Sequence, residues 1–166
     1  MKKIIVLFLI AVNVNFGFAE TGERYFDPSG EFSVCPPANW HILEFPGLKY
    51  HVYMTEPING FSPHFLFIAE QFTGDLPQYV EANIQNMKLV YPDIQYLKNE
   101  SFTTNNGARG TKLAILNPNS GNPIRQFLYI FSRGSIYYVI TCSVGNNNGQ
   151  QFEPIYDESV KTFRFE

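Results

Sequence analysis

The chain has 166 residues, a net charge of −3, 45% hydrophobic residues and two cysteines. Its 16 Phe and 10 Tyr set it apart from disordered chains, which lack apolar side chains to bury. The acidic balance argues against a nucleic-acid partner, because such proteins usually carry a basic face. Two cysteines are too few for a fold held together by disulfides, and the length fits one domain.

Residues 1–19 are typical of a secretory signal. A pair of lysines precedes an unbroken apolar run over residues 4–12, and small residues stand at the cleavage positions that end at Ala19. An uncleaved anchor is the alternative. No other run reaches the roughly 20 apolar residues that a membrane-spanning helix needs. We therefore expect a periplasmic or secreted protein whose residues 20–166 form a single domain without a membrane span.

The first part of that domain reads as short strands. Residues 31–34 alternate apolar and polar side chains, and the prolines at 36–37 end that strand because proline cannot donate to a ladder. Residues 40–45 and 49–55 suit two further short strands, and residues 64–72 suit a longer one.

A helix is predicted over residues 75–91. Asp75 can cap it, Gln78 fits the third position of a capping box, and Pro77 stands in the first turn, where its missing N–H does no harm. One apolar stripe, which we expect to pack on the core, is formed by Leu76, Val80, Ile84, Met87 and Tyr91.

The second half reads as antiparallel hairpins followed by a short closing helix over residues 152–163. Asn105–Gly107 suits a tight turn, and residues 145–151 suit an exposed loop. Hairpins followed by segregated helices indicate an α+β fold with a central antiparallel sheet. The expected strands cover residues 94–104, 110–116, 124–132 and 136–144.

Several segments resemble the PsbP-like family of domains, and the likeness covers roughly residues 25–166. The opening Gly30–Pro36 with Asn39 and Trp40 is similar to the family's start. Further similar segments follow in the expected order: a helix in the middle of the chain, then residues 107–110, 137–141 and 159–165. The resemblance implies an α/β/α sandwich, with an antiparallel sheet flanked by helices. It also implies non-catalytic accessory work and no cofactor. The family's fold is shared by a photosystem II extrinsic protein, DcrB-like periplasmic lipoproteins and a Ran-binding nuclear-transport factor.

Cys35 and Cys142 leave two possibilities open. In an oxidising compartment a pair of thiols tends to be bonded. Strand alternation, however, turns Cys142 inward and Cys35 outward, which favours two separate thiols. The chain has no Cys-x-x-Cys pair, so a redox role is not expected.

No motif assigns a catalytic or metal site. The histidines lack metal-ligand spacing, and His51, Glu56 and His64 are conceivable ligands only if neighbouring strand ends bring them together. The chain also lacks the Gly-x-Ser-x-Gly elbow that many hydrolases carry. We expect no enzyme, and a hydrolase is kept only as a remote alternative.

Ile58 and Phe61 stand in a Pro- and Gly-containing loop, where they either pack back onto the domain or contact a partner. The first function hypothesis is therefore an exported, non-catalytic accessory or binding protein of the cell envelope with an unidentified protein partner. The second is a carrier of a small ligand or a metal.

Overall fold

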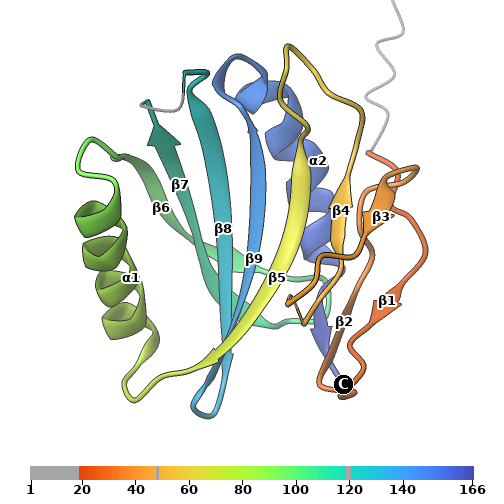
Figure 1. Ribbon diagram of the computed structural model, residues 1–166. Helices are drawn as coiled ribbons and strands as arrows, with labels where there is room; N and C mark the ends of the chain where they lie inside the picture. The colour runs from red at the N-terminus through yellow and green to blue at the C-terminus, as the bar shows by residue number, and fades with distance from the viewer. Residues whose placement is uncertain (1–18, 48, 119–120) are drawn as a thin grey trace, which may run out of the picture.

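The computed structural model describes residues 19–47, 49–118 and 121–166 (Figure 1). These residues form two antiparallel sheets and two α-helices, which confirms the predicted α+β class. Apart from Ala19, the predicted signal lies outside the described residues. The elements are β1 (Tyr25–Phe26), β2 (Phe32–Val34), β3 (His41–Leu43), β4 (Val52–Met54), β5 (His64–Gln71), α1 (Leu76–Val90), β6 (Gln95–Thr103), β7 (Arg109–Asn117), β8 (Ile124–Arg133), β9 (Ile136–Gly145), the 3-10 turn η1 (Asn146–Asn148), α2 (Gly149–Lys161) and β10 (Arg164–Phe165).

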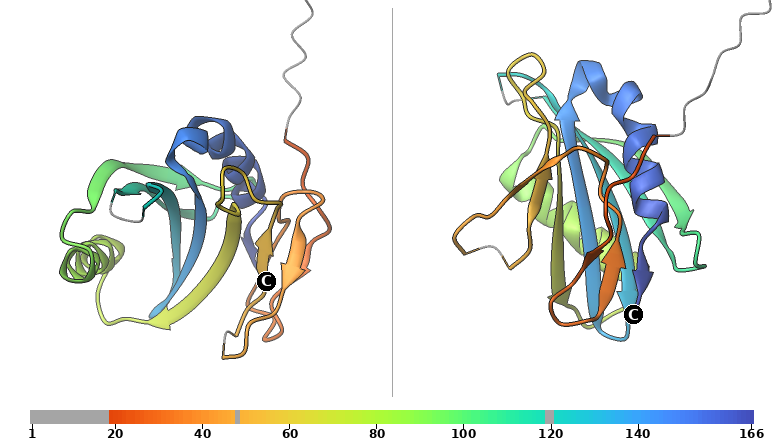
Figure 2. Two further views of the ribbon diagram at one scale, coloured as in Figure 1. Left: turned by 45° about the horizontal axis from the view of Figure 1, so that its top comes forward. Right: turned by 90° about the vertical axis from the view of Figure 1, so that its right-hand side faces the viewer.

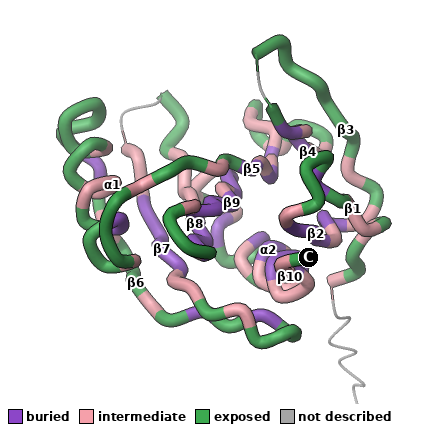
Figure 3. The backbone as a smooth tube through the Cα atoms, turned by 90° about the horizontal axis from the view of Figure 1, so that it is seen from below, coloured by how far each residue is buried: buried purple, intermediate pink, exposed green. Residues whose placement is uncertain are grey.

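The larger sheet has seven strands in the order β3-β4-β5-β9-β8-β7-β6, so β3 and β6 are its two edges. Tight turns join β6 to β7 and β8 to β9, and both use a glycine with positive φ, 82° at Gly107 and 61° at Gly134. In Figure 3 the buried residues follow the central strands, while the outer side of α1 is exposed. Within the described residues, no helix is long and apolar enough to cross a membrane.

Helix α1 covers one face of this sheet. The predicted capping box is present: the Asp75 carboxylate accepts from the Gln78 main chain at 2.9 Å, and the Gln78 side chain accepts from the Asp75 main chain at 2.9 Å. Val80 is buried, whereas Tyr91 is 49% exposed and does not belong to the packed stripe. The cap and the stripe thus fix where α1 begins and which side faces the sheet.

Helix α2 and a three-stranded sheet, ordered β1-β2-β10, cover the opposite face (Figure 2). Each face of the larger sheet therefore carries a single helix. The expected exposed loop over residues 145–151 is wrong, because η1 and the first turn of α2 occupy it. Gly149 is buried there, and a Cβ added to it would lie 2.6 Å from the Arg125 side chain.

Lys112 on β7 ties α2 to the sheet, although its side chain is only 2% exposed. Its Nζ donates to Glu153 at 2.7 Å and to Asp157 at 2.7 Å, both on α2. The Tyr129 hydroxyl donates to the same aspartate at 2.6 Å. A buried cation is tolerated only when it is paired and hydrogen-bonded, so these contacts explain a lysine inside the core.

We predict that Lys112→Ala lowers the free energy of unfolding by about 3 kcal/mol, because it leaves two partly buried carboxylates without their cation. Urea denaturation followed by circular dichroism measures the change. Lys98→Ala is the matched control, since Lys98 is 51% exposed and pairs with Glu100. Equal effects of the two substitutions would contradict the structural role of Lys112.

Candidate edge groove

A groove of about 380 Å³ runs between β1 of the small sheet and β3 of the large one. We call it the edge groove, because both strands end their sheets. Figures 1 and 2 draw the two strands on the same side of the molecule, away from α1. Its main side chains are Tyr25, Phe26, Trp40, Ile42, His51 and Tyr53.

Local structure presents Trp40 to the edge groove. Pro36 and Pro37 follow β2 closely. The backbone then turns at Asn39, whose φ is 62°, a value that asparagine tolerates better than most residues. The Trp40 indole then packs edge-on against Tyr156 of α2, with ring centres 5.9 Å apart. One side of the half-buried indole therefore rests on the core while the other lines the groove.

Three rings in the edge groove carry polar atoms that form no hydrogen bond with the described part of the chain. The ring centre of Tyr25 lies 5.6 Å from that of His51 and 6.1 Å from that of Tyr53. His51 Nδ1 is buried and has no partner, and neither tyrosine hydroxyl bonds to another described residue. Buried polar atoms normally find partners, so His51 Nδ1 is an exception, and the two unpaired hydroxyls can donate to a molecule bound in the groove.

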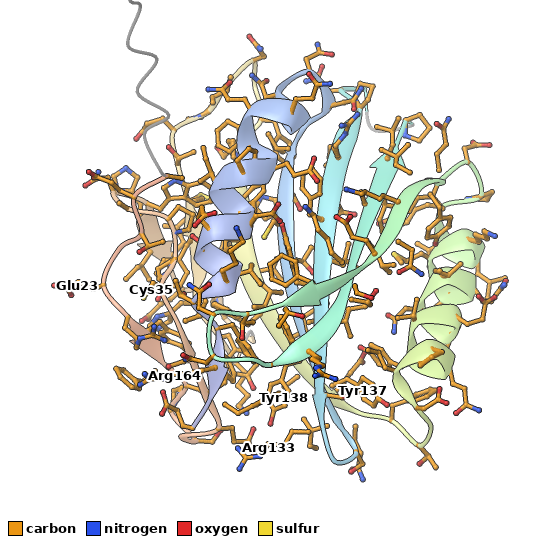
Figure 4. All side chains as sticks on the ribbon, turned by 180° about the vertical axis from the view of Figure 1, so that it is seen from behind. Glu23, Cys35, Arg133, Tyr137, Tyr138 and Arg164 are labelled. Carbon is orange, nitrogen blue, oxygen red and sulfur yellow. The ribbon has the colours of Figure 1, made fainter. Side chains whose placement is uncertain are left out.

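Burial keeps both tyrosine hydroxyls protonated. It raises the pKa of Tyr25 to about 12, with the Asp27 charge adding to the effect, and it raises the pKa of Tyr53 to about 12. Both phenols are therefore neutral at physiological pH and can donate to a carbonyl or carboxylate oxygen. Glu23 projects outward from the segment that leads into β1 (Figure 4).

Apolar side chains are exposed on the same side of the molecule. Phe26 is 57% exposed and Ile42 is 54% exposed, and both line the edge groove. Leu43 and Phe45 are exposed as well but do not line the groove, and the Leu43 side chain lies on the opposite face of β3 from Ile42. Sequence reasoning missed this surface, and the only signal for it was the density of aromatic residues between 25 and 53.

The two cysteines are free thiols in the structure, so the disulfide alternative is not formed. Cys142 lies on β9 inside the core beneath α2, and burial raises the pKa of its thiol well above the ordinary value. Cys35 follows β2 and is half-buried (Figure 4). Cys142 is buried, as strand alternation predicted, but the outward face predicted for Cys35 is wrong in its premise, because Ser33 on that face of β2 is 0% exposed.

The structure does not bring His51, Glu56 and His64 together. Glu56 pairs with His41 instead, at 3.2 Å, and His51 pairs with Glu44 at 3.3 Å. Among residues 19–47, 49–118 and 121–166, no group of three or more His, Cys, Asp or Glu side chains could hold a metal ion. The register of β3 against β4 decides these pairings, and the sequence alone did not supply it.

Ile58 and Phe61 are half-buried and line a small pocket of about 60 Å³ together with residues 145–148. Ile58 packs against the core beneath α2, and the Phe61 ring lies 5.6 Å from that of His64. The packing expected for these two side chains is thus partly present. Their contact with a partner stays a prediction.

A second groove, of about 300 Å³, runs beside α1. Three of its polar side chains are engaged within the protein: the Tyr79 hydroxyl donates to Glu70, and Asn83 donates to the Tyr79 carbonyl at 3.0 Å. The edge groove, by contrast, holds polar atoms without partners. The edge groove is therefore the stronger candidate for a binding site.

Comparisons with known proteins agree with this architecture. No family model and no curated protein sequence matches the chain. Among solved structures, cyanobacterial PsbP (CyanoP) from Synechocystis sp. PCC 6803 superposes with a TM-score of 0.63 at 12% identity, covering 92% of this chain and 96% of that one. The chain has a PsbP-like fold.

Two further solved structures share it. The Saccharomyces cerevisiae Ran-binding protein Mog1p has a TM-score of 0.58 at 11% identity, over 87% of this chain and 96% of its own. LpqN, described as involved in cell envelope biogenesis of Mycobacterium tuberculosis, has a TM-score of 0.55 at 13% identity, over 88% of this chain and 86% of its own. At these identities the likeness shows the fold alone.

We predict that His64 makes the free energy of unfolding depend on pH. Burial lowers the pKa of its imidazole below the ordinary 6.5, and its Nδ1 lies 3.0 Å from the Ser62 carbonyl. A histidine whose pKa is lowered in the folded state is protonated first in the unfolded chain. The stability it contributes is thus present above pH 6.5 and is lost as the pH falls from 6.5 toward the lower folded-state pKa.

The free energy of unfolding should therefore fall less in His64→Gln than in the wild type when the pH is lowered from about 7.5 to about 5.5. Chemical denaturation at the two pH values measures this difference. His41→Gln is the control, because the His41 side chain is 65% exposed. The same pH dependence in His64→Gln and the wild type would refute the assignment.

Proposed function

We propose that the chain is an exported, non-catalytic accessory protein of the cell envelope that binds a protein partner through the edge groove. One observation carries the proposal: a groove between two open strand edges holds two tyrosine hydroxyls that bond to no other described residue. Such a site offers hydrogen bonds that the protein itself leaves unused.

The exposed apolar side chains support a protein as the partner. Phe26 and Ile42 line the same groove and are both more than half exposed, and clustered exposed apolar residues are typical of interaction surfaces. Aromatic residues such as Trp40 and Tyr25 are frequent anchors at the centre of such interfaces. The net charge of −3 does not favour a nucleic acid.

Export to the envelope is supported by the secretory-type leader in residues 1–19. Two structural neighbours add to this proposal. LpqN is described as involved in cell envelope biogenesis, and Mog1p is described as a Ran-binding protein. At least one protein with this fold is therefore described as binding another protein.

The immobilised protein should retain a stoichiometric partner from an envelope extract of its native cell, and the double variant Phe26→Asp with Ile42→Asp should lose it. Both side chains are more than half exposed, so the new carboxylates disturb the groove rather than the core. Mass spectrometry of the retained fraction measures the loss. Leu89→Asp is the matched control, since Leu89 is 81% exposed on α1. Equal retention by the double variant and the control would count against the groove.

A further inference from the structure

The free edge of β3 presents the main chain of Ile42. Thr55 N–H donates to the Pro63 carbonyl at 3.1 Å, which fixes the alternation of hydrogen-bonded pairs between β4 and β5. By that alternation, Val52 and Met54 direct their N–H and C=O groups toward β3, and Tyr53 does not. Ile42 stands opposite Tyr53, so its own N–H and C=O point away from β4, where no further strand of the sheet lies among the described residues.

The free edge of β1 presents the main chain of Phe26 in the same way. Asp27 N–H donates to the Phe32 carbonyl at 3.0 Å, so that pair is hydrogen-bonded. Phe26 stands opposite Ser33 in the next, non-bonded pair. Its N–H and C=O therefore point away from β2, on the side where the small sheet ends.

The side chains of these two residues also line the edge groove. Within the described part of the chain, Phe26 and Ile42 thus each contribute an N–H and a C=O that no strand pairs with, and a side chain that is more than half exposed. Tyr25, Tyr53 and His51 line the same groove. An extended polypeptide is the ligand that satisfies both kinds of group, since its main chain pairs with a strand edge while its side chains fill the groove.

The opposite edge of the large sheet is built differently. β6 carries an irregularity in register between Tyr96 and Lys98, and the charged Lys98 and Glu100 stand on it. Bulges and charges are the devices by which proteins keep an edge strand from pairing. The edge at β3 carries neither an irregularity nor an acidic or basic side chain other than His41, and two of its three residues are aliphatic.

We propose that an extended segment of the partner protein adds to β3 as an eighth strand of the large sheet, hydrogen-bonded to the N–H and C=O of Ile42. The segment lies in the edge groove, with β1 on its other side and with apolar side chains directed at Trp40 and Phe26. This inference rests on the proposed function and specifies the conformation of the partner. It excludes a helical ligand, which has no free main-chain groups to pair.

The probe is a library of random linear dodecapeptides displayed on phage, selected on the full protein. Peptides that still bind the Phe26→Asp, Ile42→Asp double variant are discarded. One selected peptide is then titrated against Ile42→Ala, which keeps the edge N–H, and Ile42→Pro, which removes it. Proline is tolerated on an edge strand where the N–H faces outward, and thermal unfolding verifies that the variant folds.

Strand addition predicts that Ile42→Pro binds at least about tenfold more weakly than Ile42→Ala, since a donor to the peptide is lost. Methylation of each peptide amide in turn tests the same pairing on the wild-type protein, and at least one methyl group should weaken binding about tenfold. If neither the Ile42→Pro substitution nor any peptide methylation changes the affinity, strand addition is overturned. The peptide then binds the groove through side chains, and the proposed function is retained. If the selection yields no peptide whose binding depends on the groove, both the proposed function and strand addition fail.

Discussion

The packing of Phe32 joins the two sheets, and the rest of the structure depends on it. Its ring is 1% exposed and lies 5.6 Å from Phe67, 5.5 Å from Tyr138 and 5.6 Å from Phe163. Strands of two or three residues cannot hold themselves in place, so the small sheet depends on this contact and on its neighbours in the core. Because Phe32 fixes β2, β1 comes to lie across from β3, and the edge groove exists between them.

The C-terminus closes the same assembly. β10 pairs with β2, the Glu166 N–H donates to the Glu31 carbonyl at 3.1 Å, and the Ser33 hydroxyl donates to the Glu166 carboxylate at 2.5 Å. Arg24, just before β1, donates to the same Ser33 hydroxyl at 2.9 Å. The groove therefore depends on contacts made by residues 164–166. Helix α2 lies next to these residues, and Lys112 holds it on the sheet from beneath.

Local signals predicted most of the elements, while the groove depended on packing between distant segments. The capping residues of α1 and the turn glycines act over a few positions, so the sequence was enough to place them. In the sequence Lys112 does not differ from other polar residues on strands, because the two carboxylates that pair with it lie 41 and 45 positions away. Glu56 pairs with His41 rather than with His51, because the register of β3 against β4 depends on the whole sheet. The groove residues likewise come from three segments that only the core brings together.

The exchange of main-chain amides in the free protein tests the account most directly, because the account requires two strand edges that stay open. Hydrogen exchange followed by NMR reads each amide separately. The amides of Phe26 and Ile42 should exchange near the rate of an unstructured chain, whereas those of Tyr25 and Leu43, which pair with β2 and β4, should be protected. Equal protection at all four positions would mean that the edges are already covered and would contradict the account.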